Sequence, residues 1–247
     1  MTHRFQLELD GKQLIIETGK LAKQADGAVT VQFGGTVVLT AVVCSKEPKE
    51  DADFLPLTVE YREKTYAAGK IPGGFFKREG RPSEKEILSA RLVDRPIRPL
   101  FDEGFTHEVQ ISNMVLSSDT ENDSDVLAVI GASAALAISD IPFNGPIGTV
   151  RIGRINNKFV LNPTFKELDS SNMDLVVAGD GKDVLMVEAG LNEVSEEIVF
   201  EGIKFAQGYI KDIVELQKRI IRDVGVPKRK IVKEFTERGY YDGHLSF

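Results

Sequence analysis

Apolar and polar residues alternate along most of the first 65 residues, a pattern typical of β-strands with one buried face. Glycine interrupts the pattern at Gly11 and again at Gly34 with Gly35. Because glycine adopts the positive φ of a tight turn at little cost, these positions predict two β-hairpins, and a fifth strand follows. The five predicted strands cover residues 5–10, 12–18, 28–34, 36–43 and 54–63. Together they predict an antiparallel sheet.

A loop and then a helix follow this sheet. Residues 67–82 contain six glycines and prolines, which predicts a long loop. Ser83 and Glu86 stand at the two positions of a capping box, so a helix should begin at this point. Pro96 cannot continue a helix, so we expect the helix to end near Asp94.

The second half of the chain predicts further strands and two helices. The strand-like segments are residues 107–118, 148–155, 158–163, 173–179 and 183–190. Residues 125–139 are rich in small apolar residues and predict a buried helix, and apolar positions recur every three or four residues from Ser195 to Val224. The fold class is therefore α+β, with helices packed against sheets and a long C-terminal helix.

Composition and charge narrow the classes of function. The longest uncharged stretch, residues 126–139, has only 14 residues, fewer than the roughly 20 that cross a membrane, so no membrane association is expected. No signal peptide opens the chain, and Cys44 is its single cysteine, which favours the cytoplasm. The net charge is −7, yet residues 61–101 carry +5 and the other 206 residues −12. This basic patch is a place for a polyanion to dock, although a solvated charged face is the plainer interpretation.

Residues for metal or nucleophilic chemistry are few. The three histidines are far apart, and none is spaced from the cysteine as metal ligands are. Acidic residues recur from position 119 to position 125, and carboxylates bind cations. Asp123 or Ser124, directly before the buried helix, is better interpreted as its N-cap.

The loop sequence GGFFKREGRP, residues 73–82, combines aromatic and basic side chains. Phe75 and Phe76 directly precede Lys77 and Arg78. Exposed rings stack on unpaired bases, which contributes about 1–3 kcal/mol per base, while neighbouring cations contact phosphates. The loop therefore predicts binding to single-stranded nucleic acid without sequence preference. Equally, the two rings could anchor the loop to the body of the protein.

Three segments, residues 61–101, 129–148 and 161–179, together resemble the first RNase PH-like core of the bacterial polynucleotide phosphorylase family. The resemblance implies a two-layer RNase PH-like fold of mixed and antiparallel sheets over residues 1–225. Residues 226–247 would begin a truncated helical linker. Full-length members of the family carry a second core and RNA-binding modules, and they form ring-shaped trimers. They degrade single-stranded RNA from the 3′ end with phosphate and magnesium, releasing nucleoside diphosphates, and can join RNA-degradation complexes.

The same resemblance implies that this core is not the catalytic one. The family's phosphate-binding serine positions fall at Asp123, Ser124 and Asp125, where two carboxylates would repel a phosphate. Its metal-and-lysine cluster keeps Asp174 but has Val176 in place of the lysine. We therefore predict no catalytic residue, no metal site and no cofactor in this chain, with Mg²⁺ and inorganic phosphate bound by the second core.

What the resemblance does imply is a path for RNA. The family's aromatic constriction matches Phe75, Phe76, Lys77 and Arg78, and basic positions near the interface between cores match Arg91, Arg95 and Arg98. Arg95 and Arg98 also have a plainer interpretation, as ion-pair partners of Asp94 or Asp102. The expected partners are single-stranded RNA, the second core and two further copies of the protein. The alternative is a stand-alone, non-catalytic module for RNA binding or assembly.

Overall fold

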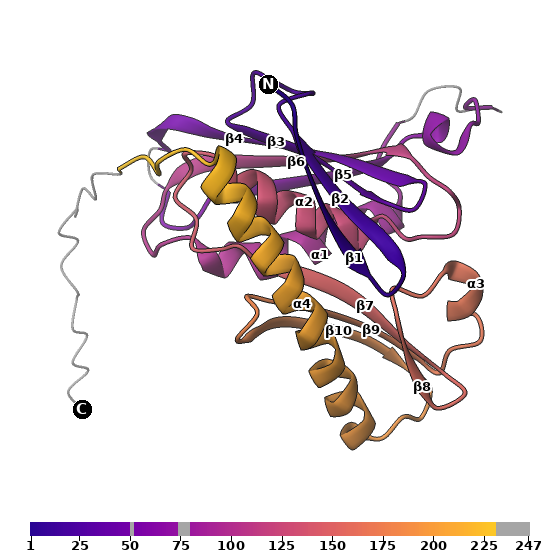
Figure 1. Ribbon diagram of the computed structural model, residues 1–247. Helices are drawn as coiled ribbons and strands as arrows, with labels where there is room; N and C mark the ends of the chain where they lie inside the picture. The colour runs from indigo at the N-terminus through magenta and orange to yellow at the C-terminus, as the bar shows by residue number, and fades with distance from the viewer. Residues whose placement is uncertain (50–51, 74–79, 231–247) are drawn as a thin grey trace, which may run out of the picture.

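The structure, a computed structural model, describes residues 1–49, 52–73 and 80–230. Within these ranges it contains two β-sheets and four α-helices (Figure 1). The predicted RNA-binding residues Phe75, Phe76, Lys77 and Arg78 lie outside the described residues.

Six strands form the first sheet, in the order β1-β2-β3-β4-β6-β5. They are β1 (His3–Leu9), β2 (Lys12–Thr18), β3 (Gly27–Phe33), β4 (Thr36–Pro48), β5 (Leu57–Glu63) and β6 (His107–Ser117). Both predicted hairpins are confirmed, since β1 pairs antiparallel with β2 and β3 with β4. Gly11 and Gly34 turn these hairpins with φ of 78° and 58°.

The fifth strand departs from the predicted antiparallel sheet. It begins at Leu57 and runs parallel to β6. Parallel neighbours need a long crossover, which residues 64–106 supply, including helix α1 (Glu84–Ile97) and the short 3₁₀ turns Thr65–Ala68 and Arg98–Leu100. β5 therefore forms the edge of the sheet, with α1 packed along it.

Helix α1 begins as predicted and ends later than predicted. Ser83 Oγ accepts a hydrogen bond from Glu86 N, and the Glu86 carboxylate accepts one from Ser83 N, which confirms the capping box. The predicted end near Asp94 is wrong, because the helix continues to Ile97. Pro96 is tolerated in the last turn since its ring is buried in the core and Arg98 N still donates to Asp94 O.

Four antiparallel strands form the second sheet, in the order β10-β9-β7-β8. They are β7 (Gly148–Ile155), β8 (Lys158–Leu161), β9 (Met173–Gly179) and β10 (Val184–Leu191). The other helices are α2 (Asp125–Ile138), α3 (Phe165–Leu168) and α4 (Glu196–Val224). These elements follow the predicted order closely.

Helix α2 lies between the two sheets, and every one of its residues is buried (Figure 1). Helix α4 crosses in front of it and packs on α2, β1 and the second sheet. Buried hydrogen bonds join α2, α4 and the start of β7. Ser133 Oγ of α2 donates to Gln217 Oε1 of α4, and Ile147 N, just before β7, donates to Ser133 Oγ, both over 2.8 Å. The α+β class with a long C-terminal helix is confirmed.

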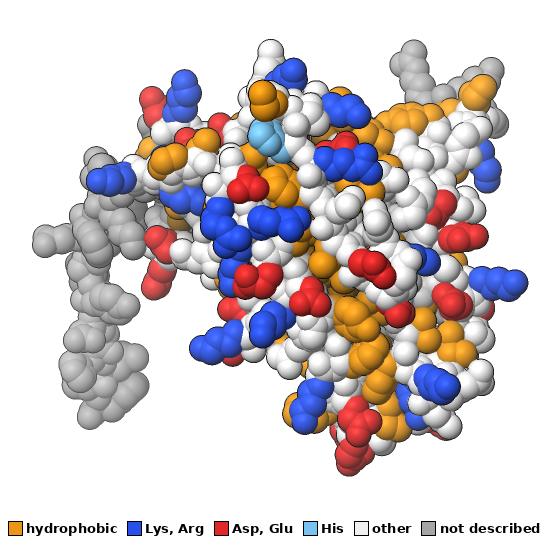
Figure 2. Space-filling view, viewed as in Figure 1, with side chains coloured by type: hydrophobic (Ala, Val, Ile, Leu, Met, Phe, Trp, Pro, Cys, Tyr) orange, Lys and Arg blue, Asp and Glu red, His pale blue; other side chains and the backbone are white. Residues whose placement is uncertain are grey.

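The chain leaves α4 in an extended segment, residues 226–230. The domain boundary predicted after residue 225 stays a prediction, as does the linker of residues 226–247. No helix among the described residues is long and apolar enough to cross a membrane. On the face shown in Figure 2, acidic and basic side chains are interspersed, and apolar side chains gather where the N-terminal half of α4 meets the second sheet.

Candidate functional site

A buried arginine faces three carboxylates where the second sheet meets α2. Arg151, on β7, approaches Asp123 through Nη1 at 3.1 Å, Asp125 through Nη2 at 2.8 Å and Asp174 through Nε at 3.5 Å. Its side chain is only 12% exposed, and those of Asp123 and Asp125 are 9% exposed. We call Arg151 and these three carboxylates the acidic centre.

A further aspartate, Asp119, lies outside the acidic centre and holds the loop that carries Asp123 and Asp125. Asp119 accepts hydrogen bonds from Thr36 Oγ1 and from the amides of Gly35, Glu121 and Asn122, each over 2.9 Å. Burial by itself raises the pKa of Asp119, but these hydrogen bonds outweigh it and hold the pKa well below its usual range. The acidic run of residues 119–125 therefore splits, because Asp119 is a structural anchor and only Asp123 and Asp125 reach the acidic centre.

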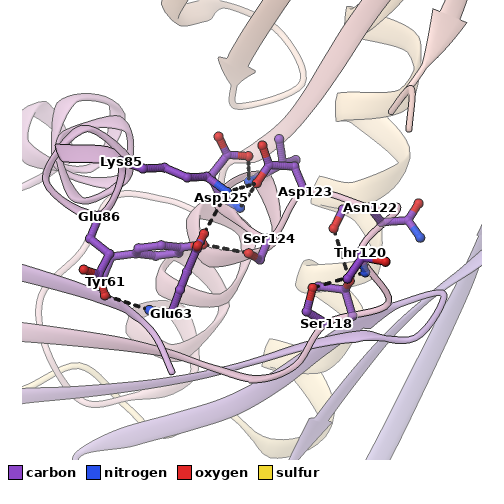
Figure 3. A network of polar contacts seen from close by, with 12 residues as sticks. Tyr61, Glu63, Lys85, Glu86, Ser118, Thr120, Asn122, Asp123, Ser124 and Asp125 are labelled. Carbon is purple, nitrogen blue, oxygen red and sulfur yellow. Dashed lines mark hydrogen bonds and ion pairs between the residues drawn. The ribbon is translucent and has the colours of Figure 1, made fainter. Parts of the chain in front are cut away.

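The predicted N-cap position is confirmed at Ser124, and Asp123 Oδ1 accepts a hydrogen bond of 3.5 Å from Asp125 N, the first residue of α2. Ser124 occupies the N-cap position of α2 but makes no capping hydrogen bond. Its hydroxyl lies 2.7 Å from the phenol oxygen of Tyr61, and the phenol donates to Glu63 Oε1 over 2.8 Å (Figure 3). Tyr61 is deeply buried, which raises its pKa far above the ordinary value and leaves its O–H in need of a partner.

Lys85 of α1 adds a second cation beside the acidic centre. Its Nζ lies 2.9 Å from Glu63 and 3.5 Å from Asp123 (Figure 3). Burial alone would lower the pKa of Lys85, but Asp123 and Glu63 outweigh it, so the pKa is raised. Each cation here already faces at least two carboxylates.

A cavity of about 550 Å³ opens over this cluster, between α1 and the second sheet. Asp123, Asp125, Asp174 and Val176 all line it. The positions that the family resemblance assigned to the phosphate and metal sites therefore lie together in space, although they come from different elements. Among the residues that the structure describes, no group of three or more His, Cys, Asp or Glu is arranged to hold a metal ion.

The three predicted RNA-binding arginines of this region have different surroundings. Arg91 is exposed, and no described residue forms an ion pair with it. Arg95 lies 3.2 Å from Glu188 of β10, with both side chains about half exposed. Arg98 is held by the Asp94 carboxylate at 2.7 Å and by the carbonyls of Leu55 and Leu57. The plainer interpretation is therefore correct for Arg98, which pairs with Asp94, and wrong for the partner of Arg95, which is Glu188. RNA binding by Arg91, Arg95 and Arg98 stays a prediction.

Sequence reasoning missed Arg151. The available signal was an arginine in the middle of β7, flanked by Val150 and Ile152, which are fully buried. A charge at such a position requires a buried partner. Which carboxylates would reach it depended on the tertiary fold.

Comparisons with known proteins agree with this geometry. Residues 10–142 match the 3′ exoribonuclease family, domain 1, and residues 145–209 match domain 2 of the same family. The polyribonucleotide nucleotidyltransferase of Thermomicrobium roseum is 56% identical over 230 residues, which cover 93% of this chain and 29% of that protein. The enzyme of that name from Thermus thermophilus is 56% identical over 226 residues, covering 92% and 32%.

A solved structure confirms the fold. The chain aligns with a TM-score of 0.64 and 19% identity to a structure described as the Archaeoglobus fulgidus exosome with RNA bound to the active site, covering 87% of each chain. The chain spans about 30% of the length of the curated relatives named above. The resemblance seen in the sequence to the first RNase PH-like core of polynucleotide phosphorylases is confirmed. Domains 1 and 2 of one family match successive parts of this chain and together cover most of its length. This chain therefore belongs to the 3′ exoribonuclease family of RNase PH-like proteins.

Proposed function

We propose that this chain is the first core of a phosphorolytic 3′→5′ exoribonuclease that degrades single-stranded RNA and releases nucleoside diphosphates. In this proposal the chain guides RNA and builds the ring, and a second core performs the reaction. The relatives named polyribonucleotide nucleotidyltransferase support the activity. A homotrimer, a role in mRNA turnover within an RNA-degradation complex, and a cytoplasmic location with its reduced Cys44 complete the proposal.

The observation that supports a non-catalytic role is the acidic centre, where Arg151 already pairs with Asp123 and Asp125. Inorganic phosphate needs unpaired donors, whereas Nη1 and Nη2 of Arg151 donate to Asp123 and Asp125, and its buried Nε faces Asp174 at 3.5 Å without a hydrogen bond. Mg²⁺ needs several carboxylates with free oxygens, whereas Asp123 and Asp125 are both paired with Arg151 and only Asp174 is half exposed. The residues present therefore fit neither group, and we place Mg²⁺ and phosphate in the second core.

We assign the guidance of RNA to the basic patch of residues 61–101. Arg91 projects from α1 without a described ion-pair partner, and the loop with Phe75, Phe76, Lys77 and Arg78 precedes the same helix. Base stacking and phosphate contacts of this kind hold a strand independently of its sequence. A strand held here would be passed to a catalytic centre on the neighbouring core.

Phosphorolysis tests the proposal. The purified chain, the separately purified second core and their mixture are each given poly(A), Mg²⁺ and phosphate, and ADP is measured. We expect no ADP from this chain, and more ADP from the mixture than from the second core. Phe75→Ala with Phe76→Ala should weaken RNA binding by the chain, and Arg91→Gln should raise the KM for RNA in the mixture.

Two results would contradict parts of the proposal. Phosphate-dependent ADP release by this chain alone, surviving repurification, would place an active site here. RNA binding by the chain with no effect on the second core would favour the stand-alone module. The matched control is Arg4→Gln, which removes an exposed arginine from β1 at the opposite edge of the first sheet.

A further inference from the structure

A second cavity, of about 300 Å³, opens between β5 and α1. Its walls are residues 59–62 of β5 on one side and Ile87, Ala90 and Arg91 of α1 on the other. The cavity above the acidic centre uses other positions of α1, including Leu88 and Leu92. The two cavities therefore lie on different faces of one helix.

Along the free edge of β5, the peptide groups at both ends have hydrogen-bond partners and those in the middle do not. Arg98 donates to the carbonyls of Leu55 and Leu57, and Glu86 accepts from Glu63 N over 2.9 Å. The carbonyl of Glu60 points the other way, since it accepts a hydrogen bond from the side-chain Nδ2 of Asn113 on β6. Alternate residues of a strand point their peptide groups to the same side, so Val59 and Tyr61 direct theirs toward α1. No described residue outside the strand bonds to them.

Two arginines and three acidic residues line this cavity. Two of its acidic residues are engaged, because Asp94 is bound by Arg98 at 2.7 Å and Glu86 by Ser83 N at 2.6 Å. Arg91 has no described ion-pair partner, whereas Arg62 makes a 3.5 Å contact with the carbonyl of Gly80 and acts electrostatically on the Glu86 carboxylate. Arg91 is therefore the cation left for a phosphate, with Arg62 beside it shared with Glu86, and Glu60 adds a further negative charge at the rim.

The shape of the opening selects a compact ligand. An extended peptide would need several consecutive edge residues to add a strand, and here only Val59 and Tyr61, the latter 2% exposed, have peptide groups without a described hydrogen-bond partner on this edge. A nucleobase needs one or two donor and acceptor pairs and an apolar wall, which Ile87 and Ala90 provide. A volume near 300 Å³ is at the lower end of small-molecule sites, which suits a single nucleotide.

We propose that the cavity between β5 and α1 binds one nucleotide, with its base against Ile87 and the peptide groups of Val59 and Tyr61 and its phosphate between Arg62 and Arg91. The ligand is a nucleoside monophosphate unit, either free or within an RNA strand. Its assignment to RNA rests on the proposed function, whereas the cavity chemistry stands without it.

Titration of the chain with AMP, followed by NMR, tests this site. We expect the amide signals of Val59 and Tyr61 to shift and saturate. Arg62→Gln and Arg91→Gln should each weaken AMP binding about tenfold, the order expected for one charged hydrogen bond. Ala90→Leu should block binding by filling the cavity without removing a charge, and Arg4→Gln should leave it unchanged.

Further arms separate the outcomes. If a short oligoadenylate displaces AMP, the site serves RNA; if AMP stays, the site serves free nucleotides. Equal shifts with inorganic phosphate alone, or no shift of these two amides, would overturn the nucleotide site. ADP release by the mixture of cores is measured in parallel. If the mixed cores release ADP but AMP shifts no amide signals, only the nucleotide site is overturned. If AMP shifts the signals but the mixed cores release no ADP, only the proposed function is overturned.

Discussion

Arg151 is one cation among three carboxylates, so the acidic centre has more negative than positive charge. Counted over the whole residue, Asp125 is the only one of the three that is buried, at 6% exposure. Burial raises its pKa to about 6 against an ordinary 3.8, with Asp123 adding to the rise and Arg151 opposing it. In the folded protein Asp125 therefore takes up a proton at a higher pH than in the unfolded chain.

This shift predicts a pH-dependent stability that Asp125→Asn removes. Between pH 3.8 and about 6 the folded state binds more protons than the unfolded state, so the stability due to this carboxyl falls as pH rises through that window. Urea denaturation across the window should show wild type losing free energy of unfolding relative to Asp125→Asn. A constant difference between the two proteins would contradict the assignment. Asp183→Asn, on an exposed turn, is the matched control.

For single residues, the sequence predicted which positions form the acidic centre but not which side chains pair with them. Asp123, Asp125 and Asp174 were singled out from the resemblance, and all three meet at one centre. Arg151 was not, because a strand position reveals burial but not which distant loop it faces. Ser124 looked like a cap because local hydrogen bonding is the usual fate of a serine before a helix, yet the buried phenol of Tyr61 took its hydroxyl.

At the scale of elements, the C-terminal end of α2 is held by the segment that follows α4. Lys228 Nζ donates to the carbonyls of Leu136, Ala137 and Ser139 over 2.8, 3.0 and 2.7 Å. These carbonyls belong to the last turn and C-cap of α2, where unpaired acceptors and the helix dipole favour a cation. One lysine thus joins the chain after α4 to the central helix.

Lys228→Met should release this connection while keeping most of the side-chain stem. We expect a loss of about 1 kcal/mol in the free energy of unfolding, typical of a lost charged contact at a helix end. Amide exchange should rise at Val226 and Arg229, which donate to Ile138 and Asp140. Lys230→Met is the control, and equal effects of the two substitutions would show that the carbonyl contacts do not matter.

Local signals predicted where elements begin better than where they end or how they pair. The capping box placed the start of α1 correctly because both hydrogen bonds lie within four residues. The end was misjudged because tertiary packing of Pro96 outweighed its helix-breaking tendency. The direction of β5 was also misjudged, since a strand sequence does not encode which neighbour it will join; the long crossover to β6 decided it.

At the scale of the whole molecule, the second sheet ends in an exposed strand. β10 pairs only with β9 among the described strands, and Val187 and Leu191 are 42% and 45% exposed along it. Leu88 of α1 is 51% exposed and lines the same cavity as Ala189 and Gly190. An unpaired strand edge next to exposed apolar side chains is a surface on which another chain can add.

The isolated chain should therefore self-associate, and Val187→Lys should suppress it, because a lysine on an edge strand cannot be buried against a second chain without losing its hydration. Light scattering over a range of concentrations gives the mass. Ile71→Lys introduces the same charge at an isolated exposed side chain and should leave association unchanged. If the wild-type chain stays monomeric at high concentration, the β10 edge is stably solvated and the prediction of self-association is wrong. If it associates, and the second core competes with that association, the apolar edge is the surface on which the two cores meet.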